Sequence, residues 1–252
     1  MQIVALSNHK GGSGKTTTTV NLAAAFAETG LRVLVVDLDP QGSATEWLGG
    51  RESAIGLVEF SEGGVGVSKL VVPTTASGVH LVPTSPSLIP RGDASRNATG
   101  LGIVRGLARL PDYWDLILID TAPTLDYLSL APLVASNHVI IPVEGHALAL
   151  PGVTSVIASI KRARRHINPH LELLGIVACR VNKTGHSREV VTQLRSQFGA
   201  VVLEHSVRDA IRIAEAPALQ LPITAYAPTS PVAADYRSVA TELLGRLGDL
   251  SS

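Results

Sequence analysis

Short apolar runs alternate with longer amphipathic stretches along most of the chain. The runs are rich in Val, Ile and Leu, and they predict strands at residues 3–6, 32–37, 79–82, 115–120, 138–143 and 173–178, with an edge strand at 201–203. The stretches between them predict helices near residues 16–29, 126–136, 151–167, 187–198 and 232–247. Strands separated by helices need crossover connections, so we predict an α/β fold with a mostly parallel sheet flanked by helices on both faces.

Two segments interrupt this alternation. Residues 49–78 are rich in Gly, Ser and Thr and resist assignment, whereas residues 90–100 are polar and loop-like. No linker separates two self-contained halves, so we expect a single domain over residues 1–252. The apolar runs are too short to cross a bilayer. The single cysteine, Cys179, excludes an internal disulfide and a cysteine metal cluster within one chain. These features predict a soluble, cytoplasmic protein.

A glycine-rich loop lies between the first predicted strand and the first predicted helix. It consists of Lys10, Gly11, Gly12, Ser13, Gly14, Lys15, Thr16 and Thr17. It matches the end of the P-loop template, although His9 stands where that template has its first glycine. Glycines let backbone N–H groups converge on phosphate oxygens, and the following helix adds its positive end. Lys15 is expected to contact the β- and γ-phosphates, and Thr16 to offer Mg²⁺ a hydroxyl. We therefore predict a nucleoside triphosphate and Mg²⁺ as ligands.

Three acids follow predicted strands, where ligands bind in open α/β sheets. They are Asp37, Asp39 and Asp120. Asp120 ends an apolar run and is expected to hold Mg²⁺ through water. Asp39 lies just past its strand, where it can orient or deprotonate the attacking water and contact the metal in a second shell. Helix capping and turn formation are the structural alternatives for such aspartates.

Charge is balanced overall but unevenly distributed. Residues 1–150 contain 9 Lys+Arg and 13 Asp+Glu, a net charge of −4, and residues 151–252 contain 12 and 8, a net charge of +4. This asymmetry permits a basic face on the C-terminal part of the chain. Lys161, Arg162, Arg164 and Arg165 form a basic cluster, which equally suits a solvated helix end.

Taken together, these motifs resemble the ParA/Soj branch of the ParA/MinD deviant Walker A ATPases. The loop at 10–17 resembles their Walker A box, residues 35–42 their second box, and residues 115–123 their Walker B segment. Segments at 212–217 and 226–231 are similar to the same branch. The resemblance covers nearly the whole chain and implies a single-domain P-loop NTPase that hydrolyses ATP with Mg²⁺.

The resemblance also implies roles for individual residues. Lys10 corresponds to the signature lysine, which enters the partner subunit's nucleotide site in an ATP-bound homodimer. Lys10, Lys15 and Asp39 are the expected catalytic residues, with Asp39 as the hydrolytic acid. Asn182 matches an adenine-contacting position, and the segment around Pro222 is expected to form the other wall of the base pocket.

Relatives in this branch bind DNA non-specifically as ATP dimers and release it after hydrolysis stimulated by a ParB-like or cargo-adaptor partner. The resemblance therefore implies a nucleoid-associated ATPase that segregates plasmids or chromosomes, or positions protein cargo. Arg208 and Arg212 match basic positions used by relatives, and Arg188 matches more weakly. Departures from the family pattern include His9 and His146. The operator-binding helix-turn-helix domain of larger relatives is expected to be absent, because no extension precedes the first strand.

Other functions fit less well. A MinD-like membrane ATPase is the main alternative, but residues 243–252 hold one Arg and two Gly, unlike a basic amphipathic anchor. A nitrogenase-like iron–sulfur reductase needs two cysteines per chain for a symmetric cluster, and this chain has only Cys179. The Pro-Gln after Asp39 and the segment at 212–217 argue against a metabolic P-loop ligase. The cargo and the stimulating partner stay open.

Overall fold

The computed structural model describes residues 1–89, 93–123, 127–145, 150–182 and 185–250. Its strands are β1 (Gln2–Leu6), β2 (Val33–Leu38), β3 (Val72–Pro73), β4 (Val79–Val82), β5 (Leu116–Thr121), β6 (His138–Glu144) and β7 (Glu172–Cys179). The α-helices are α1 (Lys15–Ala27), α2 (Ser43–Trp47), α3 (Leu57–Glu62), α4 (Val67–Leu70), α5 (Asp93–Ala108), α6 (Tyr127–Ala135), α7 (Leu150–His166), α8 (Gly185–Phe198), α9 (Ile211–Glu215), α10 (Ile223–Tyr226) and α11 (Pro231–Leu250). Three 3₁₀ helices, η1 (Pro86–Leu88), η3 (Gly199–Val201) and η4 (Ala216–Leu219), complete the described elements.

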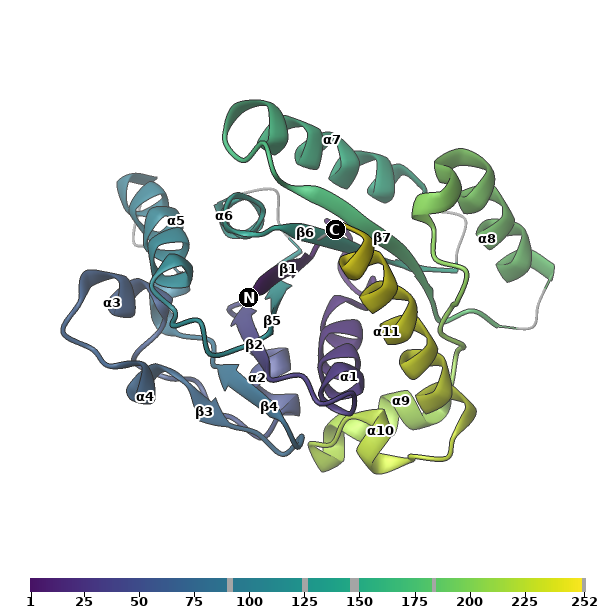
Figure 1. Ribbon diagram of the computed structural model, residues 1–252, viewed down its shortest axis with the longest axis horizontal. Helices are drawn as coiled ribbons and strands as arrows, with labels where there is room; N and C mark the ends of the chain where they lie inside the picture. Colours follow the sequence, from purple (N-terminus) through teal and green to yellow (C-terminus); the bar gives the residue numbers. More distant parts are fainter. Residues whose placement is uncertain (90–92, 124–126, 146–149, 183–184, 251–252) are drawn as a thin grey trace.

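The seven strands form one sheet in the order β3-β4-β2-β5-β1-β6-β7. Every adjacent pair is parallel except β3 with β4, which adds a short antiparallel edge. Helices cover both faces of the sheet, with α1 and α11 on one face and α5, α6 and α7 on the other (Figure 1). The predicted α/β architecture with a mostly parallel sheet is therefore confirmed.

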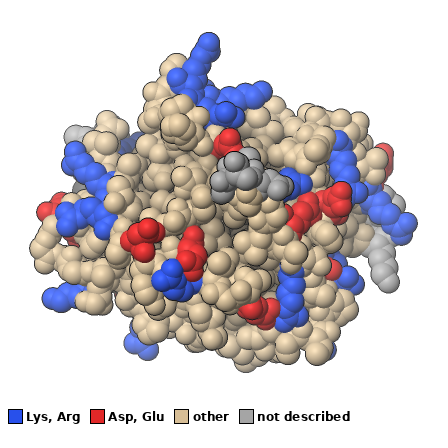
Figure 2. All heavy atoms as spheres, in the orientation of Figure 1, with Lys and Arg blue, Asp and Glu red and all other residues tan. Residues whose placement is uncertain are grey.

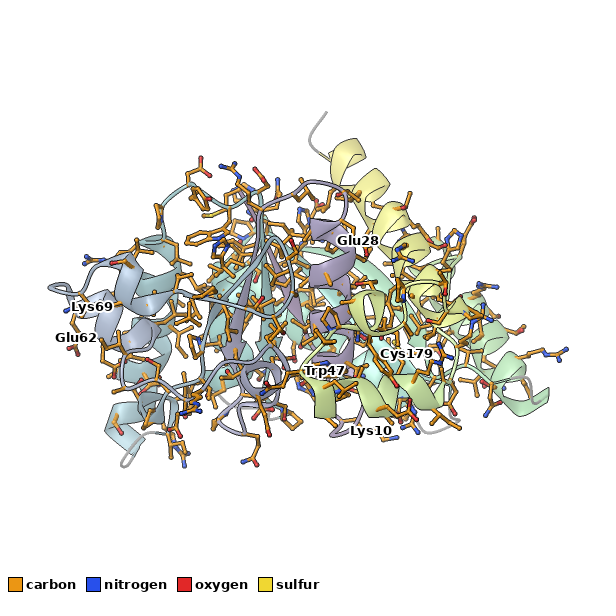
Figure 3. The ribbon with its side chains drawn as sticks, turned by 90° about the horizontal axis from the view of Figure 1, so that it is seen from below. Lys10, Glu28, Trp47, Glu62, Lys69 and Cys179 are labelled. Atoms are coloured by element: carbon orange, nitrogen blue, oxygen red, sulfur yellow. The ribbon has the colours of Figure 1, made fainter. Side chains whose placement is uncertain are left out.

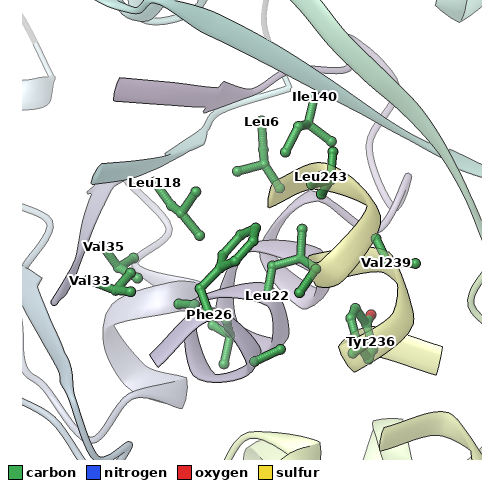
Figure 4. Close-up of a cluster of buried hydrophobic side chains, with 14 of the residues drawn as sticks. Leu6, Leu22, Phe26, Val33, Val35, Leu118, Ile140, Tyr236, Val239 and Leu243 are labelled. Carbon is green, nitrogen blue, oxygen red and sulfur yellow. The ribbon is translucent and has the colours of Figure 1, made fainter. Parts of the chain in front are cut away.

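Alternate residues of the strands enter different cores. Val33, Val35 and Leu118 pack in the same cluster as Leu22 and Phe26 of α1 (Figure 4). Their neighbours Leu34, Val36 and Ile117 face the other way, into a core shared with α3, α5 and α6. A strand buried on both faces needs an unbroken apolar run, which is why these segments were recognisable in the sequence. The central strands are thus fixed from both sides, and their ends make a rigid base for the loops that follow.

Two local expectations were wrong, and one segment left unassigned contains short elements. Residues 90–100 were expected to form a loop, but α5 begins at Asp93 and continues well beyond them. Its polar first turns hide the helix, because its buried apolar residues, Ile103 and Leu107, come late. Residues 201–203 form no strand of the sheet, and Val202 makes only an isolated parallel bridge to Ile176. The unassigned segment 49–78 contains α3, α4 and β3, which are too short to give a periodic signal.

None of the described helices is both long and apolar enough to cross a membrane.

Candidate functional site

The glycine-rich loop joins β1 to α1 at the carboxyl edge of the sheet, near its centre. Gly12 has φ 73° and Gly14 has φ 85°, a left-handed backbone that side chains disfavour. Between them the hydroxyl of Ser13 is buried and has no hydrogen-bond partner among the described residues. A loop with two left-handed glycines and an unsatisfied buried hydroxyl has the form expected of an anion cradle.

The loop opens onto a cavity of about 270 Å³. Its walls are Gly12, Ser13, Gly14, Lys15, Thr16, Thr17, Asp39, Ser43, Pro123, Glu144 and Arg180. Lys15 is 6% exposed. Burial lowers the pKa of its ammonium group, and the nearby carboxylates of Asp120 and Asp39 oppose that shift. The cavity therefore combines a wall of the glycine-rich loop with the buried cation of Lys15, which lies near Asp120 and Asp39.

Thr16 and Asp120 are brought together as the sequence predicted. Thr16 Oγ1 donates a hydrogen bond of 2.7 Å to Asp120 Oδ2, and Thr19 Oγ1 donates one of 3.2 Å to Oδ1. Asp120 is completely buried at the end of β5. A hydroxyl and a carboxylate oxygen at this separation suit Mg²⁺, which prefers hard oxygen ligands and keeps several waters. Among the described residues no group of three or more His, Cys, Asp or Glu is arranged to hold a metal by itself.

Asp120 has a buried acidic neighbour. It is the register partner of Asp37 across the β2–β5 ladder. Burial raises the pKa of Asp120 to about 7, and repulsion from Asp37 adds to the shift. Burial likewise raises the pKa of Asp37 to about 6, although hydrogen bonds from Thr45 oppose it. Two buried carboxyls beside a phosphate loop therefore favour the arrival of a cation.

Asp37 and Asp39 do different work despite their similar positions. Asp37 Oδ2 accepts hydrogen bonds from the backbone N–H and the hydroxyl of Thr45, at 2.8 and 2.7 Å. It therefore holds α2 against the sheet, which is a structural task. Asp39 is half-buried and lines the cavity, and its Oδ1 accepts the Gln41 N–H at 2.9 Å. Asp39 thus presents a carboxylate, steadied by its own turn, to whatever occupies the cavity.

Lys10 lies outside the cavity walls. Its side chain is exposed, while its backbone N–H donates to Asn8 Oδ1 at 3.0 Å. Asn8 in turn donates to the Pro142 carbonyl at 2.7 Å, which anchors the start of the loop to β6. Figure 3 shows Lys10 and Trp47 at one end of α1 and Glu28 at the other. The single chain therefore gives the Lys10 ammonium no task in its own cavity.

Sequence reasoning missed Arg180 and Glu144. Arg180 Nη1 donates to Glu144 Oε1 at 2.8 Å, and its Nε lies 3.6 Å from Asp209 Oδ1. The Glu144 side chain is 10% exposed and that of Arg180 58%. Arg180 has φ 52°, which is uncommon for a residue with a side chain. Both residues stand at the ends of parallel strands, β6 and β7, so the rule that found Asp120 could have found them too.

Arg180 also lines a second cavity, of about 330 Å³, on the other side of Gly14. Its walls are Gly14, Thr17, Thr18, Trp47, Cys179, Arg180, Val207, Arg208, Asp209, Ala210, Ile213, Ala214, Pro217 and Tyr236. Of the described residues, neither Asn182 nor Pro222 lines either cavity. Asn182 is exposed, whereas Pro222 is buried at the start of α10. Their proposed contacts with a base stay predictions.

The predicted DNA-contacting arginines have different surroundings. Arg208 makes a two-pronged ion pair with Asp235, at 2.6 and 2.8 Å. Arg212 on α9 is exposed and forms no ion pair with the residues that the structure describes. Arg188 lies on α8 and is also exposed. His146 lies outside the described residues, and His9 is half-buried near Ser159.

The first 173 residues match a family model described as an AAA domain. The chain is 40% identical over 245 residues to the chromosome-partitioning ATPase Soj of Thermus thermophilus, in a match that covers 97% of this chain and 96% of Soj. It is 31% identical to the chromosome partitioning protein ParA of Caulobacter vibrioides, over 99% of this chain and 96% of ParA.

Solved structures of nucleotide-bound proteins share the fold of this chain. A Mycobacterium smegmatis protein described as cobyrinic acid a,c-diamide synthase, with bound ADP and magnesium, superposes with a TM-score of 0.81. It is 31% identical to this chain, and the match covers 97% of this chain and 94% of that protein. The ATP complex of a Cyanothece McdA variant superposes with a TM-score of 0.84 over 97% of this chain and 96% of its own, and at 21% identity it supports the fold alone.

Proposed function

This chain belongs to the AAA-domain family that includes the partitioning ATPases Soj and ParA, and from that membership we propose that it binds DNA as an ATP-bound dimer and releases it after hydrolysis. It is a partition or positioning ATPase that uses ATP and Mg²⁺. The observation that best supports the finer proposal is that Lys15 and Thr16 line one cavity, with Asp120 hydrogen-bonded to Thr16 behind its wall, whereas Lys10 lies outside it.

The triphosphate lies along the glycine-rich loop in this proposal. The backbone N–H groups of residues 11–17 hold its oxygens, and the hydroxyl of Ser13 gains the partner that it lacks. Lys15 contacts the terminal phosphates, and Mg²⁺ is held by Thr16 and, through water, by Asp120. Mg²⁺ then neutralises charge on the phosphates. The adenine occupies the neighbouring cavity in this proposal, and contacts of the base with Asn182 and the segment around Pro222, which do not line that cavity here, stay predictions.

Hydrolysis depends on Asp39, whose carboxylate borders the phosphate cavity. It orients the attacking water and accepts its proton, and it interacts with the metal only through a bound water. The exposed Lys10 reaches the nucleotide of a partner subunit. It acts there as a point charge on the developing negative charge. Dimerisation therefore depends on the triphosphate, and loss of the γ-phosphate removes a contact between the subunits.

Arg180 makes the phosphate cavity compatible with an anion. Glu144 is a buried carboxylate in the cavity wall, where it repels a triphosphate. The 2.8 Å ion pair with Arg180 cancels that charge. We propose that Arg180 acts through Glu144 and is a positioning residue.

DNA binding is proposed to rest on Arg212, with Arg188 and Arg208 in support. Arg212 is exposed, whereas the charge of Arg208 is compensated by Asp235. Contacts of lysine and arginine with phosphate release counterions, so the affinity should fall steeply as salt rises. A ParB-like or cargo-adaptor protein would stimulate hydrolysis and so end the DNA-bound state on the nucleoid.

The decisive experiment compares DNA binding by the wild-type protein with that by Asp39→Ala, in ATP and in ADP. We expect ATP-dependent, salt-sensitive DNA binding, which persists longest in Asp39→Ala because the ATP dimer cannot turn over. Equal DNA affinity with ATP, ADP and no nucleotide would refute the switch. Unchanged ATP turnover in Asp39→Ala would remove Asp39 from the mechanism.

Two added measurements on the same protein, binding to anionic vesicles and ATP turnover with a carboxylate acceptor, separate two competing functions. A MinD-like membrane ATPase would bind anionic vesicles in ATP and leave DNA free. A metabolic amide synthase, as the mycobacterial relative is described, would need an acceptor carboxylate for ATP turnover and would not bind DNA. The identity of 40% to Soj against 31% to that protein favours the partitioning function.

A further inference from the structure

An apolar groove runs between α5 and α6, away from the nucleotide cavities. It has a volume of about 460 Å³, and its walls include Leu101, Val104, Tyr127, Leu130, Val134 and Ile167. Three of these are large aliphatic side chains left in solvent: Leu101 is 55% exposed, Leu130 42% and Ile167 54%. Contiguous exposed aliphatic side chains that line a concavity are a feature of interaction sites.

The groove is held open by a specific contact. Asn168 Nδ2 lies within hydrogen-bond distance of three carbonyl oxygens at the end of α6, those of Leu133, Val134 and Ser136, at 3.1, 3.1 and 2.8 Å. This contact fixes the preceding Ile167 beside Val134. The residues of α5 in the groove recur at positions 97, 100, 101 and 104, which lie on one face of a helix. The groove is therefore a preformed surface between two helices.

Cations outnumber acids around the groove. Arg105 lies one turn beyond Leu101 on α5, and Arg164 lies one turn before Ile167. In the sequence, residues 93–108, 126–135 and 150–171 contain six Lys and Arg against two acids, Asp93 and Asp126, of which Asp126 lies outside the described residues. Figure 2 shows Lys and Arg side chains gathered over the end of α7, at the top of the view. The surroundings of the groove therefore favour a partner with negative charge.

From this combination we propose that the groove between α5 and α6 binds an acidic amphipathic helix of a partner protein. The apolar face of such a helix enters the groove at i, i+4 and i+7 spacing. Its acidic flanks meet Arg105 and Arg164. This partner differs in charge from a stimulating protein with a basic segment, so it is a separate binding event.

Three other occupants fit less well. A second copy of this chain would place like charges against each other, since a symmetric interface uses the same surface twice. Duplex DNA presents phosphates to the cations but leaves the three aliphatic side chains in water or against a polar backbone. An anionic membrane matches the charge but is flat, whereas this surface is concave.

The position of α6 gives the groove a connection to the nucleotide site. The helix begins at Tyr127, seven residues after Asp120 at the end of β5. A partner bound against α6 therefore contacts the element that directly follows the metal-site acid. This inference needs no DNA binding, so it can fail or hold independently of the proposed switch.

The test uses the full chain and two synthetic peptides. One carries leucines at i, i+4, i+7 and i+11 with glutamates on both flanks, and the other has the same composition scrambled. We expect the first to bind with micromolar affinity and the second to bind at least about tenfold more weakly. Ile167→Asp and the double variant Arg105→Glu/Arg164→Glu should each weaken the first peptide at least about tenfold, with ATP turnover unchanged. Lys69→Glu on α4, outside the groove, is the matched charge-reversal control.

A charge swap completes the test. A peptide with lysines in place of the glutamates should bind Arg105→Glu/Arg164→Glu better than it binds the wild-type chain. Equal binding of the ordered and scrambled peptides, or no effect of the variants, would overturn the proposal. A parallel loss of duplex DNA binding in Arg105→Glu/Arg164→Glu, with Ile167→Asp unaffected, would instead assign the surface to nucleic acid. Loss of binding to phosphatidylglycerol vesicles in all variants, without peptide binding, would assign it to a membrane.

Discussion

Replacing Arg180 by alanine tests whether the Glu144 carboxylate in the cavity wall weakens ATP binding when its charge is not neutralised. The substitution leaves the Glu144 carboxylate, which is 10% exposed, without its 2.8 Å partner. Truncating one member of a buried charge pair costs about 2–5 kcal/mol. Since the arginine side chain is 58% exposed and water screens it, we take the lower end. A loss of about 2 kcal/mol corresponds to roughly 30-fold weaker ATP binding.

The assay is a titration with a fluorescent ATP analogue in Mg²⁺, with thermal unfolding as a check on folding. Adding Glu144→Gln to Arg180→Ala removes the unpaired carboxylate, so the double variant should bind within about threefold of wild type. Arg237→Ala is the matched control, because it deletes an arginine from the exposed ion pair with Glu28, at the far end of α1. If the double variant binds ATP as weakly as Arg180→Ala, the guanidinium contacts the nucleotide directly and the reasoning is wrong.

Three further predictions address the rest of the site. Lys15→Ala should abolish ATP binding, because it removes the buried cation of the cavity; tight binding by that variant in the same titration would refute the loop assignment. Arg212→Ala should weaken ATP-dependent DNA binding more than Arg208→Ala, because Asp235 already compensates the charge of Arg208. The reverse order in a gel-shift assay would show that the DNA-binding surface is centred on Arg208 instead of Arg212. The nucleotide-free protein should lose stability as pH rises from about 4 to about 7, because the unfolded chain releases the Asp120 proton near pH 4 and the folded chain holds it until about 7. Denaturant unfolding of Asp120→Asn should show a flatter pH dependence, and an unchanged slope would contradict the raised pKa.

The sequence predicted the part of the site that follows directly from strand ends. Asp120 was recognisable because an apolar run buried on both faces stops at it, and the structure places it 2.7 Å from Thr16. Arg180 also stands at a strand end, so the same rule could have found it, but its pairing with Glu144 depends on the side-by-side arrangement of β6 and β7. Its charge makes sense only beside Glu144, 36 residues earlier. Pairings of this kind are set by tertiary structure and leave no local pattern.

The same distinction holds for the fold. The helix expected at 16–29 is α1, since its apolar stripe is regular. The helix α5 was missed because its early turns are polar and its burial against α3 and α6 comes from distant segments. The groove between α5 and α6 was therefore invisible to sequence reasoning, whereas the basic cluster at 161–165 was not.

The place of β1 in the sheet has a consequence for how the protein assembles. β1 lies between β5 and β6, and its register partners, Leu116 for Gln2 and His138 for Val4, lie more than a hundred residues away in the chain. The helix α1 is covered on its other side by α11, which starts at Pro231. During synthesis the glycine-rich loop therefore has no rigid base until β5 and β6 have been made and have paired with β1. Pairing over such separations slows folding, so nascent chains should acquire nucleotide affinity late, and in one step with the closure of the sheet.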